Sequence, residues 1–208
     1  AGQALKVNTA GNAFEFGAAG GLVLLEEKDV ASGSAAAQPF HFQNIFSSTY
    51  RTYKAIYTVK ETESQANNNN CALIVRLGTG GTLSTGTSST VKHSLFYNRA
   101  DQTTNSVVYG DSDDLLVFCQ NFSNNEDMLA MGSCEFHNFQ TADIPAFSIS
   151  ETIMHGSTNS NYFEHAHNLL QNNNNFTDVS FEIKVTGGGS GGNMDYTTTG
   201  YNVFGNVK

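Results

Sequence analysis

The chain of 208 residues contains no tryptophan and only two prolines, and charged residues make up just 14% of it. Lys and Arg number 10 against 19 Asp and Glu, which gives a formal net charge of −9. Binding to nucleic acid depends on Lys and Arg that neutralise phosphates, and docking on anionic lipid needs the same side chains. The composition therefore argues against a nucleic-acid partner and against attachment to a charged membrane surface.

Long apolar runs are missing as well. No stretch approaches the roughly 20 apolar residues that a membrane-spanning helix requires, so we expect no membrane insertion. The first residues, Ala1–Lys6, have neither an initiating Met nor a basic-then-apolar leader, so we expect a processed product or a fragment of a longer protein.

Cysteine is scarce too. Cys71, Cys119 and Cys134 cannot all pair within one chain, and each lies in or beside an apolar stretch. A free cysteine in such surroundings behaves as a small hydrophobic side chain. We therefore expect three reduced core thiols, which suits synthesis in a reducing compartment.

The signal that recurs along the chain is an alternation of apolar and polar residues. It is clear over residues 53–60, where only Ile56 breaks the pattern, and over residues 179–185. Such alternation predicts strands with one face on a core and the other in water. Cys71–Leu77 is apolar on both sides, as in a strand buried on both faces. Further predicted strands are Leu22–Val30, Val91–Tyr97, Leu115–Phe122, Met128–Phe139, Ala146–Met154 and Tyr201–Val207.

Clusters rich in Gly, Asn, Ser and Thr separate these segments. Many short strands at fairly even spacing predict an all-β fold, here a jelly-roll-like antiparallel β-sandwich. Only two short stretches are compatible with a helix, Phe42–Thr49 and His165–Gln171.

Residues 1–21 differ from the rest of the chain. Ala4–Val7 and Ala13–Phe16 predict two very short strands around a turn at residues 8–12, and residues 17–21 predict a flexible joint. A two-stranded element of this size is not stable alone in water. It needs a partner, either residues 22–208 or copies of itself from other chains; the alternative is a frayed tail.

The segment Gly2–Gly17 resembles the pattern LKVN-x-AG-x-A-x-E-[FW]-G of bacteriophage tail-fibre proteins. The rest of the chain resembles the β-sandwich head that follows this pattern in such fibres. The matching segments are Leu22–Lys28 for the first strand, residues 45–53 for the approach to the second, Val75–Gly81 for an RL-x-x-GG turn, and Val203–Lys208 for a closing [LV]-[YF]-G-[IVL]-K strand. Asn206, an extra residue in the closing motif, and the Asn-rich stretch Gln171–Phe176 depart from the family pattern.

The resemblance implies a homotrimeric virion fibre, made in the cytoplasm of the bacterial host, whose distal head touches the host surface. Residues 1–21 are then the fibre or trimerisation segment, and residues 22–208 are the head domain. Three copies would give the short strands partners and bury their apolar side chains. The predicted trimer contacts are Leu5, Val7, Phe14 and Phe16.

His165 and His167 are the sharpest local feature. Positions i and i+2 of a strand face the same way, so both imidazoles can bind one metal ion. The resemblance adds that some phage fibres hold an octahedral ion between His-x-His pairs on the trimer axis. The alternative is a pair of exposed or hydrogen-bonded histidines, because the apolar residues around them indicate a helical turn or loop. A second candidate, the carboxylates of Asp111–Asp114, suits Ca²⁺ but equally an ordinary turn.

Catalytic signatures are weak. A glycan-cleaving enzyme needs two carboxylates that converge on a cleft. The candidates, Glu135, Glu151, Glu164 and Asp178, are scattered along the chain. The one Gly-x-Ser-x-Gly match, at residues 188–192, lies in a Gly-rich turn without the strand-turn-helix setting of a nucleophile elbow. We expect neither catalysis nor a cofactor.

This composition fits a binding surface better than a catalytic site. Loops of Asn, Ser, Thr and Tyr on a rigid sandwich can hydrogen-bond sugar hydroxyls and stack on the apolar faces of sugar rings. The predicted receptor-binding residues are Asn121, Asn124, Asn125, Asn159, Asn161, Tyr162, Asn173 and Asn174, with Tyr97 or Tyr109 nearby.

The leading hypothesis is therefore the distal part of a phage tail fibre. Its head attaches to a bacterial surface receptor, a glycan or a protein, and its other partners are its own copies and further tail proteins of the virion. The alternative is a structural virion protein, such as a capsid decoration or baseplate component, that uses the same sandwich for assembly; a large exposed apolar patch on the head would favour it. A glycan-active enzyme is the third class.

Overall fold

The structure is a computed structural model. It describes residues 3–7, 13–18, 21–34, 40–61, 70–83, 91–99, 105–112, 115–123, 129–140, 146–155, 161–170, 176–185 and 195–207. Over these ranges the chain forms fifteen strands and no helix, so the all-β prediction is confirmed. None of the described residues belongs to a helix long and apolar enough to cross a membrane.

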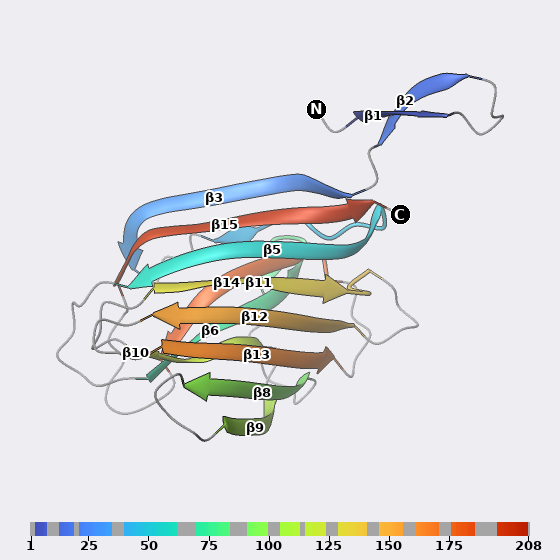
Figure 1. Ribbon diagram of the computed structural model, residues 1–208. Helices are drawn as coiled ribbons and strands as arrows, with labels where there is room; N and C mark the ends of the chain where they lie inside the picture. The colour runs from blue at the N-terminus through green and yellow to red at the C-terminus, as the bar shows by residue number, and fades with distance from the viewer. Residues whose placement is uncertain are drawn as a thin grey trace.

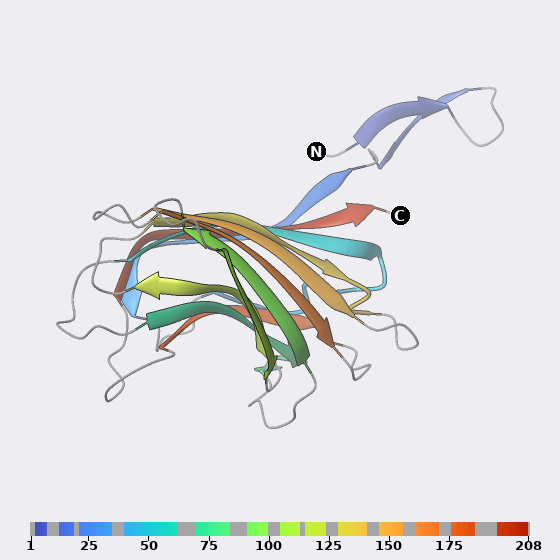
Figure 2. The ribbon, with the colours of Figure 1, turned by 60° about the horizontal axis from the view of Figure 1, so that its bottom comes forward.

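Two antiparallel sheets form the body of the molecule (Figures 1 and 2). The larger sheet has the order β3 (Leu22–Ser34), β15 (Asp195–Val207), β5 (Tyr50–Glu61), β11 (Leu129–His137), β12 (Phe147–His155), β13 (Asn161–Leu170), β8 (Val91–Arg99) and β9 (Asn105–Ser112). The smaller has the order β10 (Leu115–Ser123), β6 (Asn70–Thr79), β14 (Asp178–Val185) and β4 (His41–Phe42), with β7 (Thr82–Leu83) paired to β6. Figure 2 shows the small sheet beneath one face of the curved large sheet, as in a sandwich.

The core between the sheets is built from phenylalanine and tyrosine. Phe181 of β14 stacks on Tyr201 of β15 with ring centroids 4.5 Å apart, and Phe136 of β11 contacts Phe46 at 5.5 Å. All four rings are buried. Stacked and tilted ring pairs of this kind stabilise a core beyond the area that they bury. These rings fill the space in a chain that has no tryptophan.

The predicted strands are confirmed at nine places, with ends that differ by a few residues. Two longer strands, β9 and β13, were missed. β13 covers most of the stretch at His165–Gln171, so the helical interpretation there was wrong. The other helical candidate was wrong as well, because Phe42 ends strand β4 and residues 43–49 form turns and irregular chain.

The turn predicted at Val75–Gly81 is confirmed as a two-residue hairpin between β6 and β7. Thr79 pairs with Thr82, and the two residues between them, Gly80 and Gly81, have φ angles of 61° and 85°. Positive φ at both central positions is the geometry of a type I′ turn, which glycine adopts without steric cost.

The N-terminal strands, β1 (Gln3–Val7) and β2 (Phe14–Ala18), pair antiparallel with each other and form a separate two-stranded sheet. Leu5 is opposite Phe16, and Val7 is opposite Phe14. Figures 1 and 2 both show this ribbon projecting beyond the sandwich at the end where the C-terminus lies. The short strands are thus confirmed, and β2 extends through two residues of the predicted joint.

Cys134 of β11 is a buried free thiol, as predicted. Burial raises the pKa of this thiol well above its ordinary value, although a hydrogen bond with Ser148 opposes the shift. Cys71 and Cys119 belong to β6 and β10, and their side chains lie outside the described residues.

Candidate functional site on the outer face of the large sheet

The two halves of the large sheet distribute their side chains in opposite ways. On β5 the inward positions, Tyr53, Ala55, Tyr57 and Val59, are buried and mostly apolar. On β12 the inward positions Ser148, Ser150 and Thr152 are buried and polar, whereas Ile149 and Ile153 point outward. On β13 Glu164 and Asn168 are buried, whereas Phe163 and Leu169 are exposed. Met154 of β12 and Ala166 and Leu170 of β13 are buried as well, so the inner side of these two strands mixes polar with apolar side chains, whereas that of β5 is almost wholly apolar.

The inward polar side chains of this half are hydrogen-bonded. Asn168 Nδ2 donates to Ser148 Oγ over 3.1 Å, and the hydroxyls of Tyr57 and Thr152 form a short hydrogen bond. Buried polar groups without such partners would destabilise the fold. These hydrogen bonds offset the burial of the polar side chains, which share the inner face with apolar Met154, Ala166 and Leu170.

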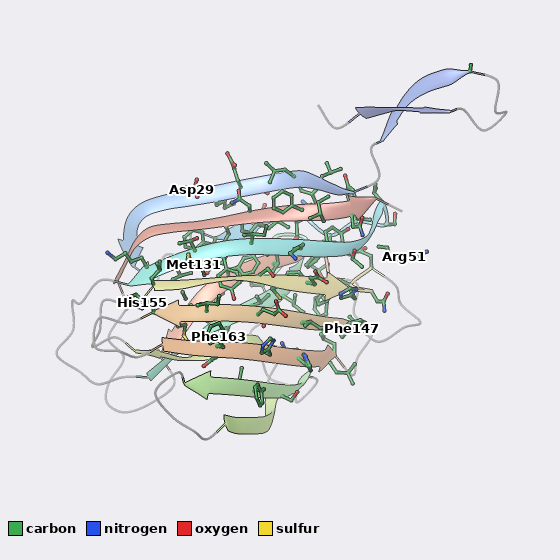
Figure 3. The ribbon with its side chains drawn as sticks, viewed as in Figure 1. Asp29, Arg51, Met131, Phe147, His155 and Phe163 are labelled. Carbon is green, nitrogen blue, oxygen red and sulfur yellow. The ribbon has the colours of Figure 1, made fainter. Side chains whose placement is uncertain are left out.

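The outward side chains form an apolar row across three strands. Met131 pairs with Ile153, and Ile153 pairs with Phe163, so the three residues are direct neighbours from β11 to β13. Their exposed fractions are 45%, 49% and 50%. Figure 3, which looks onto this face, shows Met131 and Phe163 on strands either side of β12. An aromatic ring and two aliphatic chains thus stand together in solvent.

The next row of the sheet is polar. Ser133 of β11 pairs with Glu151 of β12, and Glu151 pairs with His165 of β13. His165 Nδ1 lies 3.6 Å from Glu151 Oε1, and both side chains are largely exposed. The His165 ring also lies 6.4 Å from the ring of Phe96, its cross-strand partner on β8. A carboxylate and an imidazole therefore border the apolar row.

These two rows enclose a groove of about 350 Å³ on the outer face, with Met131, Ile153 and Phe163 on its apolar side and Ser133, Glu151 and His165 on its polar side. Gly132 also lines it. A Cβ at Gly132 would clash with the backbone oxygen of Glu151 and with the Tyr57 hydroxyl, so a residue without a side chain is required here. This Cβ would point to the inner side, so Gly132 serves the close approach of β11 to β12, and it is the small outward side chain of Ser133 that leaves space in the groove.

Charged and aromatic pairs continue the outer face beyond the groove. Lys54 Nζ lies 3.3 Å from Glu135 Oε1, and the His137 ring stacks on Phe147 with centroids 4.5 Å apart. Polar and apolar side chains therefore alternate over the face.

The predicted metal ligands lie on one strand and one face, as the i, i+2 spacing requires. His165 and His167 are both exposed on β13. Their neighbour in sequence, Glu164, faces inward and is buried, so it does not join them. Across the residues that the structure describes, no three His, Cys, Asp or Glu side chains come together in a metal-binding arrangement.

Most of the predicted receptor-binding residues cannot be placed. Asn124, Asn125, Asn159, Asn173 and Asn174 lie outside the described residues. Asn121, Asn161 and Tyr162 were predicted on loops, but their backbones belong to strands β10 and β13. Tyr97 and Tyr109 likewise belong to β8 and β9. The side chains of these five residues lie outside the described residues.

The four candidate catalytic carboxylates occupy different environments. Glu135 and Glu151 lie on the outer face, Glu164 points inward from the same sheet, and Asp178 is buried in the small sheet. Two of them, Glu151 and Glu164, line the groove. Glu151 lies on the surface of the groove, whereas the side chain of Glu164 is buried on the inner side of the sheet.

Asp178 has a structural role. Burial alone would raise the pKa of its carboxyl, but hydrogen bonds from the Asn44 N–H, the Thr177 hydroxyl and the Gly81 N–H, together with nearby His41, lower the pKa. The carboxylate thereby joins the β4–β5 connection to the β6–β7 turn. This explains its burial without a catalytic role.

No protein-family model and no curated protein matches this sequence.

Sequence reasoning missed the groove residues as a group. The signal was present in residues 147–155, where Phe, Ile and Ile alternate with Ser, Ser and Thr, but the sequence does not state which side faces the core.

Proposed function

We propose that the chain is the distal part of a phage tail fibre, with a jelly-roll-like head that attaches to a glycan on the bacterial surface. In this proposal the N-terminal ribbon holds three copies together, the outer face of the large sheet binds the receptor, and neither catalysis nor a cofactor is involved. The fibre is made in the host cytoplasm and joins other tail proteins in the virion.

The observation that carries the binding function is the exposed apolar row of Met131, Ile153 and Phe163, which lies over strands that bury polar side chains on their inner side. Phe163 and Ile153 leave about half of their surface in water when an isolated head folds, and the buried serines behind them add little hydrophobic stabilisation. A chain selected for stability alone would place these residues the other way round. An apolar surface that folding does not require favours a binding role.

The ribbon supports the fibre part of the proposal. β1 and β2 pair only with each other among the described strands. Because a two-stranded ribbon of this length is not stable by itself, identical copies are the simplest source of its missing contacts. Three heads on one fibre would then bind a repetitive surface together, so weak single sites give firm attachment.

The second candidate function is assembly within the virion. Exposed large apolar residues also occur outside the groove, at Leu22 and Leu24 of β3, Ile56 of β5 and Leu169 of β13. A face covered by another virion protein would have this composition. The two candidates differ in what binds the face, and a cell-binding experiment separates them.

The deciding experiment measures the attachment of fluorescently labelled 1–208 to a panel of bacterial strains. We expect binding to a subset of strains, and we expect purified polysaccharide from those strains to compete with it. Binding to no strain, together with capture by purified virion particles that lack this protein, would support the assembly function instead.

Trimer formation is tested separately by light scattering after size exclusion. We expect 1–208 to have three times the mass of one chain and residues 22–208 alone to be smaller. The double variant Leu5→Ser, Phe16→Ser, which alters one directly opposed pair of the ribbon, should lose the trimer. A monomeric 1–208 would contradict the fibre assembly and leave the binding surface of the head to be judged by attachment.

A further inference from the structure

We propose that the groove between β11 and β13 takes a neutral pyranose that carries a methyl group, in the form of an acetamido or a 6-deoxy sugar. This inference rests on the proposed attachment function and specifies its ligand. It assigns the contact to a sheet face and to Met131, Glu151, Ile153, Phe163 and His165, away from the Asn-rich loops.

The size and shape of the groove suit one sugar ring. Its volume of about 350 Å³ lies at the lower end of the range of small-molecule sites, roughly 300–1,000 Å³. The half-exposed ring of Phe163 offers a flat apolar face on which the C–H face of a pyranose can lie. The small outward side chain of Ser133 leaves room for the ring to enter.

The apolar side of the groove explains the methyl group. An unsubstituted hexose presents hydroxyls around its rim and would leave Met131 and Ile153 without a matching surface. A methyl group from an acetamido or 6-deoxy substituent would cover these side chains and remove apolar area from water. The methyl group is the feature that the two sugar classes share.

The polar side selects for hydrogen-bond donors and against negative charge. Glu151 is 71% exposed, and its carboxylate can accept hydrogen bonds from hydroxyl or amide N–H groups. His165 lies beside it, with Nδ1 3.6 Å from Glu151 Oε1. The chain carries a net charge of −9, so sialic or uronic acids would be repelled. The charge pattern therefore favours a neutral sugar.

A protein partner fits this part of the face less well. The core of a protein interface is depleted of charged residues, which gather at its rim. Here Glu151 and His165 stand directly beside the apolar row. The Lys54–Glu135 pair lies on the neighbouring strands β5 and β11, with Glu135 two residues beyond Ser133. Such close interleaving is typical of a site for a hydroxylated ligand.

The test uses isothermal titration of intact 1–208 with methyl glycosides in matched pairs. The acetamido arm compares N-acetylglucosamine with glucose, and the 6-deoxy arm compares L-fucose with L-galactose. We expect millimolar binding of the methyl-bearing member of one pair, at least fivefold tighter than its partner. The arm that responds identifies the class of sugar.

Three variants locate the binding. Phe163→Ala should weaken it at least tenfold, and Glu151→Gln should weaken it about threefold to tenfold. Leu169→Ala is the matched control, because Leu169 lies on the same strand and face as Phe163, is similarly exposed and does not line the groove. All three positions are exposed, and circular dichroism checks that each variant folds.

Equal binding of both members of each pair, or no binding of any of the four sugars, would overturn this inference. Unchanged binding in Phe163→Ala would overturn it as well. If labelled 1–208 still attached to cells in such a case, the attachment function would stand and only the groove assignment would fail. If attachment also failed, the proposed function itself would be contradicted.

Discussion

Strands β5 and β13 belong to the same sheet and face the same small sheet, yet they place opposite kinds of residue on its two sides. β5 buries Tyr53 and Tyr57 and exposes Lys54, whereas β13 buries Glu164 and Asn168 and exposes Phe163. The first arrangement is what folding alone favours. The second requires hydrogen bonds to satisfy the buried polar groups and leaves apolar area in water. β13 still adds Ala166 and Leu170 to the core, so the comparison distinguishes an almost wholly apolar inner side from a mixed one whose outer side is the surface that we propose for recognition.

The largest expected effect on stability is in the aromatic core beneath β5 and β11. Phe136 is fully buried and contacts the rings of Phe46, Phe139 and Phe181. Phe136→Ala should lower the free energy of unfolding by about 3–5 kcal/mol, because it removes buried area and leaves a cavity. Urea unfolding followed by circular dichroism measures this loss. A loss below about 1 kcal/mol would show that the aromatic core is not what holds the sheets together.

Asp178 of the small sheet tests a buried carboxylate through the pH dependence of stability. Because its pKa is lower in the folded chain, the unfolded chain binds more protons as the solution becomes acidic. Its contribution is therefore present above the ordinary pKa of 3.8 and is lost as the pH falls through the folded value. Asp178→Asn should cost about 2 kcal/mol at pH 7, since hydrogen bonds to the carboxylate weaken.

In the same variant the free energy of unfolding should fall less steeply as the pH decreases from 7 to 3, the acid limb of its pH dependence. Urea unfolding at each pH measures this. Asp29→Asn is the control, because Asp29 is exposed on β3 and its replacement should leave that limb unchanged. An unaltered limb in Asp178→Asn would mean that other groups govern the acid dependence.

Gly132 lies where the two halves meet. Gly132→Ala should destabilise the fold by about 1–3 kcal/mol, because the new methyl would press on the β12 backbone and on the Tyr57 hydroxyl. Thermal unfolding measures the effect. Ser133→Ala, one residue further on the outward side, should change stability far less. Equal effects would indicate that the close approach of β11 to β12 is not tight.

The smallest expected effect on stability is on the outer side of β13, where we propose that the ligand binds. Phe163→Ala should change the free energy of unfolding by no more than about 0.5 kcal/mol, because an exposed side chain is lost without a cavity. The urea experiment used for Phe136→Ala measures both phenylalanines under the same conditions. Equal losses at the two positions would remove the distinction between the two faces.

The sequence was sufficient to predict the strands in which apolar residues alternate regularly with polar ones. Residues 53–60 and 179–185 were predicted as strands and lie in β5 and β14. β13 was missed because its outward residues, Phe163, His165, His167 and Leu169, mix aromatic, imidazole and aliphatic groups and hide the period. For the groove, the alternation of residues 147–155 was visible, but the side that faces the core depends on which strands pack beneath it. That information is non-local.

The connection between ribbon and head has a mechanical consequence. The chain enters the sandwich through β3, which pairs antiparallel with β15 from Leu22 opposite Asn206 to Ser34 opposite Asp195. Backbone hydrogen bonds between such strands run perpendicular to the chain direction. A pull along β3 therefore acts on many of these hydrogen bonds in shear at the same time. The force is shared among them from the start, so no single bond has to break first. A head tethered in this way would withstand tension between an anchored cell and a moving particle better than one suspended from a loop.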